Sequence, residues 1–318
     1  MSRTAFLATS ALAVAALGFQ LSTAHGKHSW NNYHWERTTN PVSFVLGHNL
    51  TAEQWDVPPA GETSTFLQQA AFDWKTPNEI NIAGIHDDTG NHASTDADKC
   101  DISNDFSGPI DWVIDVCSKE YGSNGWLGVA QIWIIDGHII EGVAKLNDTY
   151  FKSGTYDKPS WRDFVMCQEV GHVFGLGHQD ESFYNPEKVD ADGTKTCMDY
   201  TSRPEDNGQP NLHDHEQLRL IYNHNDDSPE TVEDTGPGKG KGGGPKKASV
   251  PGKLVSVSGF QFATYVRNDV SEWGTAVAFT DKGQPRVFVK DLDNGVTVVT
   301  HVTWTEDARA GVHFPHQH

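Results

Sequence analysis

The chain has 318 residues, of which 43 are acidic and 24 are basic, so its formal net charge at pH 7 is −19. Nucleic-acid binding needs clustered cations opposite the phosphates, so this balance argues against a nucleic-acid partner. An acid excess of this kind is typical of a well-solvated surface.

The first residues have the pattern of a secretory signal peptide. Arg3 precedes an apolar stretch over residues 5–17, and Ser22-Thr23-Ala24 places small residues at the two positions that signal peptidase reads. We therefore predict cleavage after Ala24 and a secreted, extracellular mature chain. The apolar stretch is too short to span a bilayer and nothing later replaces it, so we expect no membrane span.

The first half of the mature chain carries strand and helix signals. Residues 41–46 predict a strand, and residues 64–74 predict a helix whose apolar side chains recur on one face. Residues 80–85 alternate in polarity and predict a second strand. Two apolar, β-branched runs, residues 128–135 and 139–146, flank Asp-Gly and predict a β-hairpin.

A metal-binding pattern follows the hairpin. Residues 167–178 read Cys-Gln-Glu-Val-Gly-His-Val-Phe-Gly-Leu-Gly-His, which is the zinc-protease pattern H-E-x-x-H-x-x-G-x-x-H with Gln168 in place of the first histidine. Residues 161–174 predict a helix, in which Gln168 and His172 lie one turn apart on the same face. These two side chains can therefore bind one metal ion.

The end of the pattern indicates how the other groups reach the ion. Gly175 lets the chain leave the helix in a conformation closed to residues with a Cβ, so that His178 returns toward the metal. Glu169 sits beside the ligands, where its carboxylate can act on a metal-bound water. The predicted ligands of Zn²⁺ are thus Gln168, His172 and His178, and Glu169 is a predicted catalytic residue.

The pattern, with the downstream sequence Cys197-Met198-Asp199-Tyr200, resembles the metzincin clan of zinc endopeptidases. In that clan a tight turn carrying a methionine forms a floor beneath the metal, which is the place the resemblance gives to Met198. The tyrosine two positions later resembles the arrangement in astacin-like and serralysin-like members, where it helps the transition state. The resemblance therefore makes Tyr200 a second candidate catalytic residue.

The resemblance extends to secreted matrixin-like bacterial proteins that share the Gln-Glu-Val-Gly-His form. It implies an α+β, metzincin-like catalytic domain, with a mixed twisted sheet, an active-site helix and a C-terminal helix. In such a domain an edge strand beside the cleft pairs with extended substrate. One of the two hairpin strands is a candidate for this role, and a plain buried hairpin is the alternative. The matching stretches cover most of residues 30–224 and are Asn32-Tyr33-His34-Trp35, Gly125-Trp126-Leu127-Gly128-Val129-Ala130-Gln131, Asn147-Asp148-Thr149-Tyr150-Phe151 and Pro210-Asn211-Leu212-His213-Asp214.

The glutamine leaves the third metal ligand open. Zinc prefers thiolate, imidazole and carboxylate, and a neutral amide oxygen is a poorer donor than imidazole. Either Gln168 ligates through Oε1, or a water or another side chain takes its place, or the site has lost useful metal binding. Asp180 is the nearest carboxylate that can compensate, and an ordinary solvated or capping residue is its alternative interpretation.

Four cysteines, an even number in an exported chain, indicate two disulfides with three possible pairings. The metzincin resemblance places the segment before the ligands against the methionine turn. It thereby implies a disulfide between Cys167 and Cys197, which leaves Cys100 for Cys117. No cysteine precedes Cys100 that could block zinc as in the matrixin cysteine switch, so latency must come from elsewhere.

Two acidic clusters, residues 86–88 and 190–193, are candidate Ca²⁺ sites. An ordinary turn is the alternative for the second cluster.

The last third of the chain changes character. Residues 212–224 predict a helix, and residues 254–304 predict short strands separated by Asp-Lys-Gly and Asp-Asn-Gly turns. The segment between them is rich in Asp, Glu, Gly, Pro and Lys, as in flexible linkers. We therefore divide the chain into a signal peptide (1–24), a metallopeptidase domain (25–224), a linker (225–250) and a small β-rich module (251–318).

These observations predict a secreted zinc-dependent metalloendopeptidase that hydrolyses peptide bonds of a protein or peptide substrate. The alternative is a catalytically silent zincin fold that serves as a binding module. The retained Glu169 argues against this alternative, because a binding scaffold has no chemical need for a carboxylate beside the ligands. A structural zinc protein is a third interpretation, but such sites usually have four protein ligands and only two good ones are visible.

Overall fold

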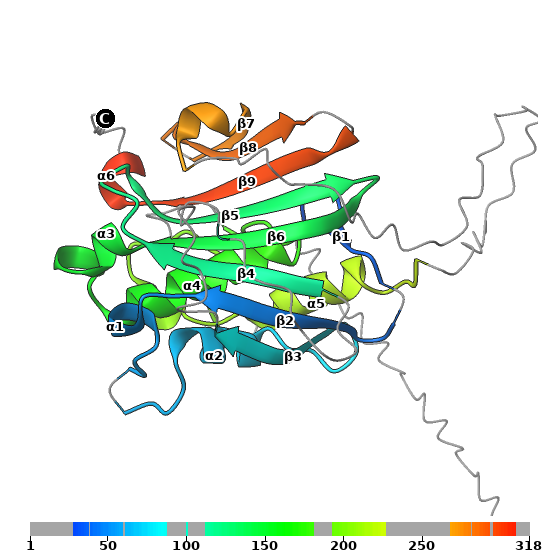
Figure 1. The fold of residues 1–318 in the computed structure, drawn as a ribbon, viewed down its shortest axis with the longest axis horizontal. Helices are drawn as coiled ribbons and strands as arrows, with labels where there is room; N and C mark the ends of the chain where they lie inside the picture. Colours follow the sequence, from blue (N-terminus) through cyan, green and yellow to red (C-terminus); the bar gives the residue numbers. More distant parts are fainter. Residues whose placement is uncertain are drawn as a thin grey trace, which may run out of the picture.

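The structure is a computed structural model of the chain (Figure 1), which describes residues 28–37, 39–59, 61–87, 100, 112–180, 193–226, 268–280, 282–292 and 295–309. These residues form a mixed fold of strands and helices. The predicted signal peptide, nearly all of the predicted linker and most of the 190–193 calcium candidate lie outside the described residues. Within the described ranges, no helix is long and apolar enough to cross a membrane.

The described strands form one sheet, in the order β3-β2-β4-β6-β5-β9-β8-β7, with β1 paired to β6 beside this path. Strands β1 to β4 pair in parallel with one another or with β6, whereas β5, β7, β8 and β9 pair antiparallel with their neighbours. The strands are β1 (His34–Trp35), β2 (Val42–Asn49), β3 (Ile80–Asp87), β4 (Trp112–Lys119), β5 (Trp126–Ile135), β6 (His138–Asn147), β7 (Thr275–Phe279), β8 (Pro285–Asp291) and β9 (Thr297–Trp304).

The predicted hairpin is confirmed and has the expected turn. Strands β5 and β6 pair antiparallel, and Asp136 and Gly137 between them have φ angles of 50° and 89°. A two-residue turn with positive φ at both positions matches the twist of the flanking strands, which is why Asp-Gly is favoured there.

Helices pack on the sheet and begin where the sequence supplies caps. Thr65 and Gln68 form a capping box at the start of α2, and Asn211 and Asp214 form another at the start of α5. The α-helices are α1 (Ala52–Trp55), α2 (Phe66–Asp73), α3 (Asp148–Phe151), α4 (Pro159–Val173), α5 (Leu212–Ile221) and α6 (Glu306–Arg309). Three 3₁₀ helices are η1 (Gly154–Tyr156), η2 (Pro204–Asp206) and η3 (Val270–Glu272).

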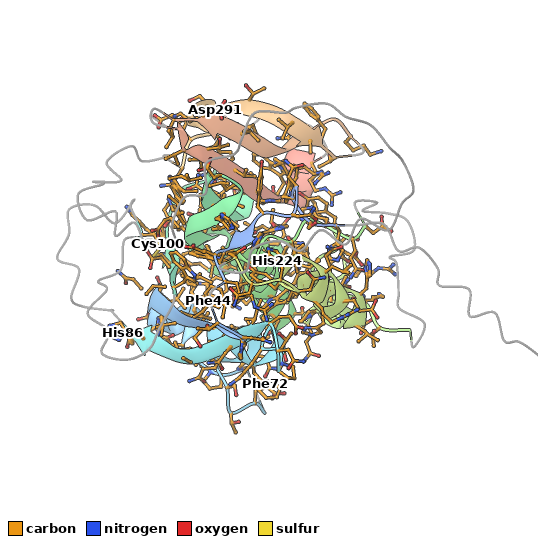
Figure 2. The ribbon with its side chains drawn as sticks, turned by 90° about the vertical axis from the view of Figure 1, so that its right-hand side faces the viewer. Phe44, Phe72, His86, Cys100, His224 and Asp291 are labelled. Atoms are coloured by element: carbon orange, nitrogen blue, oxygen red, sulfur yellow. A yellow bond between two sulfur atoms is a disulfide. The ribbon has the colours of Figure 1, made fainter. Side chains whose placement is uncertain are left out.

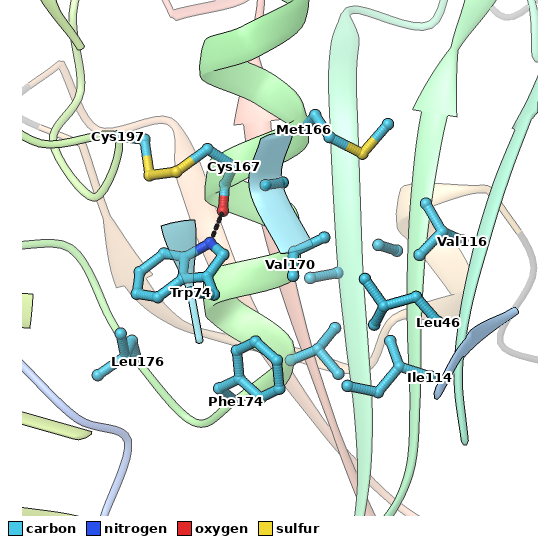
Figure 3. Packing of buried hydrophobic residues seen from close by; sticks show 14 of the residues in the cluster. Leu46, Trp74, Ile114, Val116, Met166, Cys167, Val170, Phe174, Leu176 and Cys197 are labelled. Atoms are coloured by element: carbon cyan, nitrogen blue, oxygen red, sulfur yellow. Dashed lines mark hydrogen bonds between the residues drawn. A yellow bond between two sulfur atoms is a disulfide. The ribbon is translucent and has the colours of Figure 1, made fainter. Parts of the chain in front are cut away.

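Helix α4, which carries the metal-binding pattern, lies in the core against β5, β6 and α2. Phe44 of β2 is fully buried in this core, whereas Phe72 of α2 points outward and is 76% exposed (Figure 2). Trp74, at the end of α2, donates its indole N–H to the carbonyl of Cys167 over 2.9 Å (Figure 3). This contact fixes the two helices against each other.

Both disulfides have the pairing that the resemblance implied. Cys167 is bonded to Cys197, and Cys100 is bonded to Cys117. The first bond joins α4 to the segment that carries Met198 (Figure 3).

The strands from the predicted β-rich module do not form a sheet of their own. Strand β9 pairs antiparallel with β5, with His301 opposite Ala130 and Thr303 opposite Gly128, and β8 and β7 follow outward (Figure 1). As a result, β5 lies between β6 and β9 and β6 lies between β4 and β5. Neither hairpin strand is an edge strand in this structure, which corresponds to the buried-hairpin alternative.

Asp163 on α4 gives a pH-dependent prediction. Burial, followed by repulsion from Asp73 and Glu62, raises the pKa of Asp163 to about 6 from 3.8. The protonated carboxyl is therefore favoured in the folded chain, and its stabilisation is lost as the pH rises from 3.8 through 6. We expect Asp163→Asn to raise the melting temperature by about 2–4 °C at pH 8 and to leave it nearly unchanged at pH 3.5.

Circular-dichroism melting of the variant and the natural chain at both pH values checks this expectation. Asp206→Asn, at an exposed carboxylate of η2, is the control and should not show the pH-dependent gain. Equal stabilisation by Asp163→Asn at both pH values would mean that the ionised carboxylate is not the source of the gain.

Candidate active site

His172 and His178 lie together as the pattern predicts. His172 is in the last turn of α4, and its Nε2 atom lies 3.1 Å from Nε2 of His178. The Nδ1 of His172 lies 2.8 Å from the carbonyl oxygen of Leu176, which places the ring proton on Nδ1 and leaves the Nε2 lone pair free. Burial lowers the pKa of His172 to about 3, so the ring is neutral, as a metal ligand must be.

Two glycines of the pattern are required by close contacts. Gly175 has a φ of 95°, and a Cβ there would lie 2.2 Å from the carbonyl oxygen of Tyr33. A Cβ on Gly171 would lie 2.6 Å from the sulfur of Met198, so the methionine packs directly against α4 next to His172. The chain therefore leaves α4 as predicted, and Met198 lies against the helix that carries the ligands.

Gln168 is held by backbone carbonyls rather than by the histidines. Its Nε2 donates to the carbonyl oxygens of Cys197 and Asp199 over 2.8 and 2.9 Å, and its Oε1 accepts a hydrogen bond from Thr303 over 2.5 Å. Among the described residues these are its polar partners. Neither His172 nor His178 is thus among the hydrogen-bond partners of Gln168 in the described part of the chain.

Glu169 is fully buried between α4 and β9. Its Oε1 lies 2.6 Å from Oγ1 of Thr303, and its Oε2 has no hydrogen-bond partner among the described residues. A Cβ on Gly128 of β5 would lie 2.4 Å from Oε1, so glycine is needed opposite this carboxyl group. Burial raises the pKa of Glu169 to about 8, against the opposing effect of the Thr303 hydrogen bond.

The Thr303 hydroxyl group has one proton and two oxygen neighbours, Gln168 Oε1 and Glu169 Oε1. With Glu169 protonated on Oε1, its carboxyl group donates to Thr303 and the hydroxyl group donates to Gln168, which gives each of these three oxygen atoms a hydrogen-bond partner. This arrangement agrees with the raised pKa of Glu169. In this form Glu169 is therefore a neutral hydrogen-bond donor rather than a base.

Further residues of the C-terminal strands lie on the two histidines. His301 of β9 stacks on His172, with ring centroids 4.1 Å apart and planes at 17°. Arg286 of β8 is buried, and its Nη1 lies 3.2 Å from Nδ1 of His178. Because imidazole lone pairs lie in the ring plane, a ring stacked flat on His172 does not direct its nitrogens at the same point.

Tyr200, the second predicted catalytic residue, is also engaged by this part of the chain. Its hydroxyl group donates to the carbonyl oxygen of Val302 over 2.8 Å, and the guanidinium of Arg309 lies 4.4 Å from its ring centroid. The ring of Tyr200 lies 4.3 Å from that of His178. The structure thus brings Tyr200 beside the histidines, with its hydroxyl group bonded to β9.

The contact between Arg286 and His178 determines how well zinc fits between the two histidines in this structure. A guanidinium can only donate, so Nδ1 of His178 accepts, and the proton of the neutral ring lies on Nε2, directed at His172. The two histidines then satisfy each other without an ion, and a buried cation beside them repels a second one. Two imidazoles converging at this spacing fit zinc, provided that Arg286 has moved away.

Asp180 holds the chain after His178 in place. Its backbone N–H donates to Oδ1 of Asp199 over 2.9 Å, and its carbonyl oxygen accepts from the N–H of Tyr200 over 2.9 Å. These contacts fasten the chain after His178 to the segment that follows Met198.

The sequence did not predict that Arg286, His301, Thr303 and Arg309 belong to the site. They lie beyond the predicted linker: Arg286, His301 and Thr303 are in strands of the predicted β-rich module, and Arg309 is in α6. Comparison with protein-family models and with curated proteins finds no match for this chain. The chemistry of the site therefore has to follow from its own residues.

Replacing Gln168 tests the third ligand position. We expect Gln168→His to tighten zinc binding about tenfold or more, because imidazole is a better zinc donor than an amide and points the same way from the helix. Competition with a chromophoric chelator measures the affinity. Gln69→His, which adds the same side chain on α2, should leave it unchanged. An unaltered affinity for Gln168→His would mean that position 168 does not face the ion.

Proposed function

We propose that this chain is an exported zinc-dependent metalloendopeptidase that folds in a closed, latent form. The observation that carries the proposal is the pair of buried Nε2 atoms of His172 and His178, which lie 3.1 Å apart; His172 is on α4, which also carries Glu169, and His178 follows this helix. The two disulfides are compatible with an extracellular protein.

The roles of the residues follow from their chemistry. His172 and His178 would hold the ion, with Gln168 or a water as the third ligand. Zinc, when bound, polarises the scissile carbonyl group and lowers the pKa of its water. Glu169 accepts the proton of the attacking water and passes it to the leaving nitrogen. The ring of Tyr200 lies beside that of His178, and its hydroxyl group is the candidate for stabilising the transition state.

The substrate is proposed to bind as an extended strand along β5. Backbone hydrogen bonds of an added strand give affinity for many sequences, and side-chain pockets then select among them. In the closed form β9 holds this edge of β5 in antiparallel register, from Trp126 opposite Trp304 to Ile134 opposite Thr297. The C-terminal strand therefore takes the position proposed for the substrate.

Three contacts support latency. Strand β9 covers β5, Thr303 is bonded to the carboxyl group of Glu169, and Arg286 donates to His178. The first prevents substrate from pairing with β5, the second occupies the general base Glu169, and the third opposes metal binding by His178. Displacement of β8 and β9 would free all three together.

The same closure favours a second candidate function, a zincin-like fold without catalysis that serves in binding. In that case the contacts of Gln168, Thr303 and Arg286 are permanent core interactions. The two candidates differ in whether the opened, zinc-loaded chain cleaves peptides.

The test uses a dye-quenched unfolded protein as substrate and a chain opened by Thr303→Asp. We expect cleavage that stops on addition of a chelator and returns with added zinc. The double variant His172→Ala/His178→Ala in the same opened chain should remain inactive with or without zinc. If the opened chain binds zinc at His172 and His178 yet cleaves nothing, the binding module is the better interpretation.

A further inference from the structure

Three histidines and one aspartate from distant parts of the chain meet in a cluster outside the catalytic pattern. His34 lies in β1, His138 begins β6, and His224 and Asp226 follow α5. The Nε2 atoms of His34, His138 and His224 lie 3.4, 3.3 and 3.1 Å from Oδ1 of Asp226. The Nε2 atoms of His34 and His224 lie 3.1 Å from each other.

The fold fixes the cluster through backbone contacts. Strands β1 and β6 pair in parallel with His34 opposite His138, which puts the two rings side by side. The N–H of Arg37 donates to Oδ2 of Asp226 over 2.5 Å, and the N–H of Asp226 donates to the carbonyl oxygen of Arg37. One carboxylate oxygen is thus held by the backbone while the other faces the imidazoles. His224 is labelled in Figure 2.

The donor atoms of the cluster face one another in a way that a cation would satisfy. Nδ1 of His34 lies 2.8 Å from the carbonyl oxygen of Asn32, so it carries the proton and Nε2 of the neutral ring carries a lone pair. That lone pair faces both Oδ1 of Asp226 and Nε2 of His224. In addition, three imidazoles converge on one carboxylate oxygen, which has two lone pairs. A cation between His34, His224 and Asp226 would accept one donor atom from each, because these three atoms all lie within 4.8 Å of one another.

The spacing and chemistry of the donors indicate which cation. Zinc bonds of about 2.0–2.1 Å in a tetrahedron place neighbouring donors about 3.3–3.4 Å apart, close to the separations within the cluster. Calcium and magnesium prefer oxygen-rich sites, whereas two imidazoles beside a carboxylate suit zinc and related transition metals. The bond of His34 Nδ1 to the carbonyl oxygen of Asn32 is the outer contact that orients a metal-ligating histidine.

We propose that His34, His224 and Asp226 form a second metal centre that binds one zinc ion, with a water molecule as the fourth ligand. His138 contacts Oδ1 of Asp226 from outside the ligand set. The centre holds β1 and the chain after α5 together, and His138 links the start of β6 to it. The side chains of His138 and His224 are 34% and 47% exposed, so the ion can enter from solvent. The proposal does not depend on the proposed function.

The electrostatics of Asp226 agree with this assignment. Burial opposes ionisation, but hydrogen bonds from the His138 ring and from the backbone N–H of Arg37 help to hold the pKa of Asp226 well below its usual range. The carboxylate is therefore charged over the whole physiological range and ready to bind a cation.

The experiment uses the full chain with His172→Ala/His178→Ala, so that any remaining zinc cannot belong to the catalytic pattern. After zinc loading and desalting, mass spectrometry of the elements should find about one zinc per chain. X-ray absorption at the zinc edge should show about four nitrogen or oxygen neighbours at about 2.0–2.1 Å, two of them imidazoles. Adding Asp226→Asn or His224→Gln should lower the zinc content at least fivefold, whereas His86→Gln on β3 should not change it.

Two results would overturn the proposal. A folded, disulfide-bonded His172→Ala/His178→Ala chain that retains no zinc after loading has no second centre. A zinc ion in an octahedral or oxygen-only environment, or a zinc content unaffected by both cluster variants, places the metal elsewhere. The absorption measurement needs no substitution in the cluster, so it remains decisive if the cluster variants fail to fold.

Discussion

Thr303→Asp is expected to raise the cleavage rate of the zinc-loaded chain about tenfold or more, because about 1.4 kcal/mol in the closing equilibrium already changes the open fraction tenfold. In the closed form the new carboxylate would face Gln168 Oε1, an acceptor that loses the hydrogen bond now donated by the hydroxyl group, and the carboxyl group of Glu169, with which it would share a single proton. Burying a carboxylate against these two groups costs several kcal/mol. Since Thr303 lies on β9, this cost falls on closure rather than on α4.

Thr275→Asp is the matched control, because it makes the same change at an exposed position of β7 in the same module. Its cleavage rate should equal that of the natural chain. Hydrogen exchange at the amides of β5 reports opening independently of activity. If Thr303→Asp speeds exchange in β5 while the cleavage rate stays at the natural level, closure is not what silences the site.

Glu169→Gln in the opened Thr303→Asp chain is expected to lower the cleavage rate about 10²–10⁴-fold while the zinc content stays the same. The amide keeps the size of the carboxyl group but cannot accept a proton from water. Cleavage of the dye-quenched substrate and elemental analysis of the same preparation measure the two quantities together.

Glu205→Gln, at an exposed position of η2, is the corresponding control and should cleave at the rate of the opened chain. Loss of zinc together with activity would make Glu169 a ligand rather than a base. An unaltered rate with zinc in place would mean that another group accepts the proton.

Local sequence patterns predicted the parts of the fold that local chemistry determines. The Asp136-Gly137 turn predicted the hairpin because only a few residues accept positive φ at both positions. The convergence of His172 and His178 followed from helical spacing and from Gly175. The helices at 64–74 and 212–224 were predicted within a few residues of α2 and α5 because each has an apolar face. In the structure a capping box marks the start of each.

Local patterns could not predict features that depend on pairing between segments far apart in the sequence. Strand β4 was not predicted, because the buried Asp115 interrupts its short apolar run. Thr303 and His301 looked like ordinary residues of a β-strand, since nothing local shows that β9 pairs with β5. His34 and Asp226 are 192 positions apart, so no spacing pattern could connect them as ligands.

Strand β9 has neighbours on both sides, β5 on one and β8 on the other, so its departure bares a long row of backbone amide and carbonyl groups on β5. Such a row pairs readily with any extended chain, including the same strand of another molecule. An activated molecule left without substrate would accordingly be prone to self-association or self-digestion. The C-terminal segment would then prevent aggregation as well as block the site. Its release would cause the least self-association where peptide substrate is already abundant.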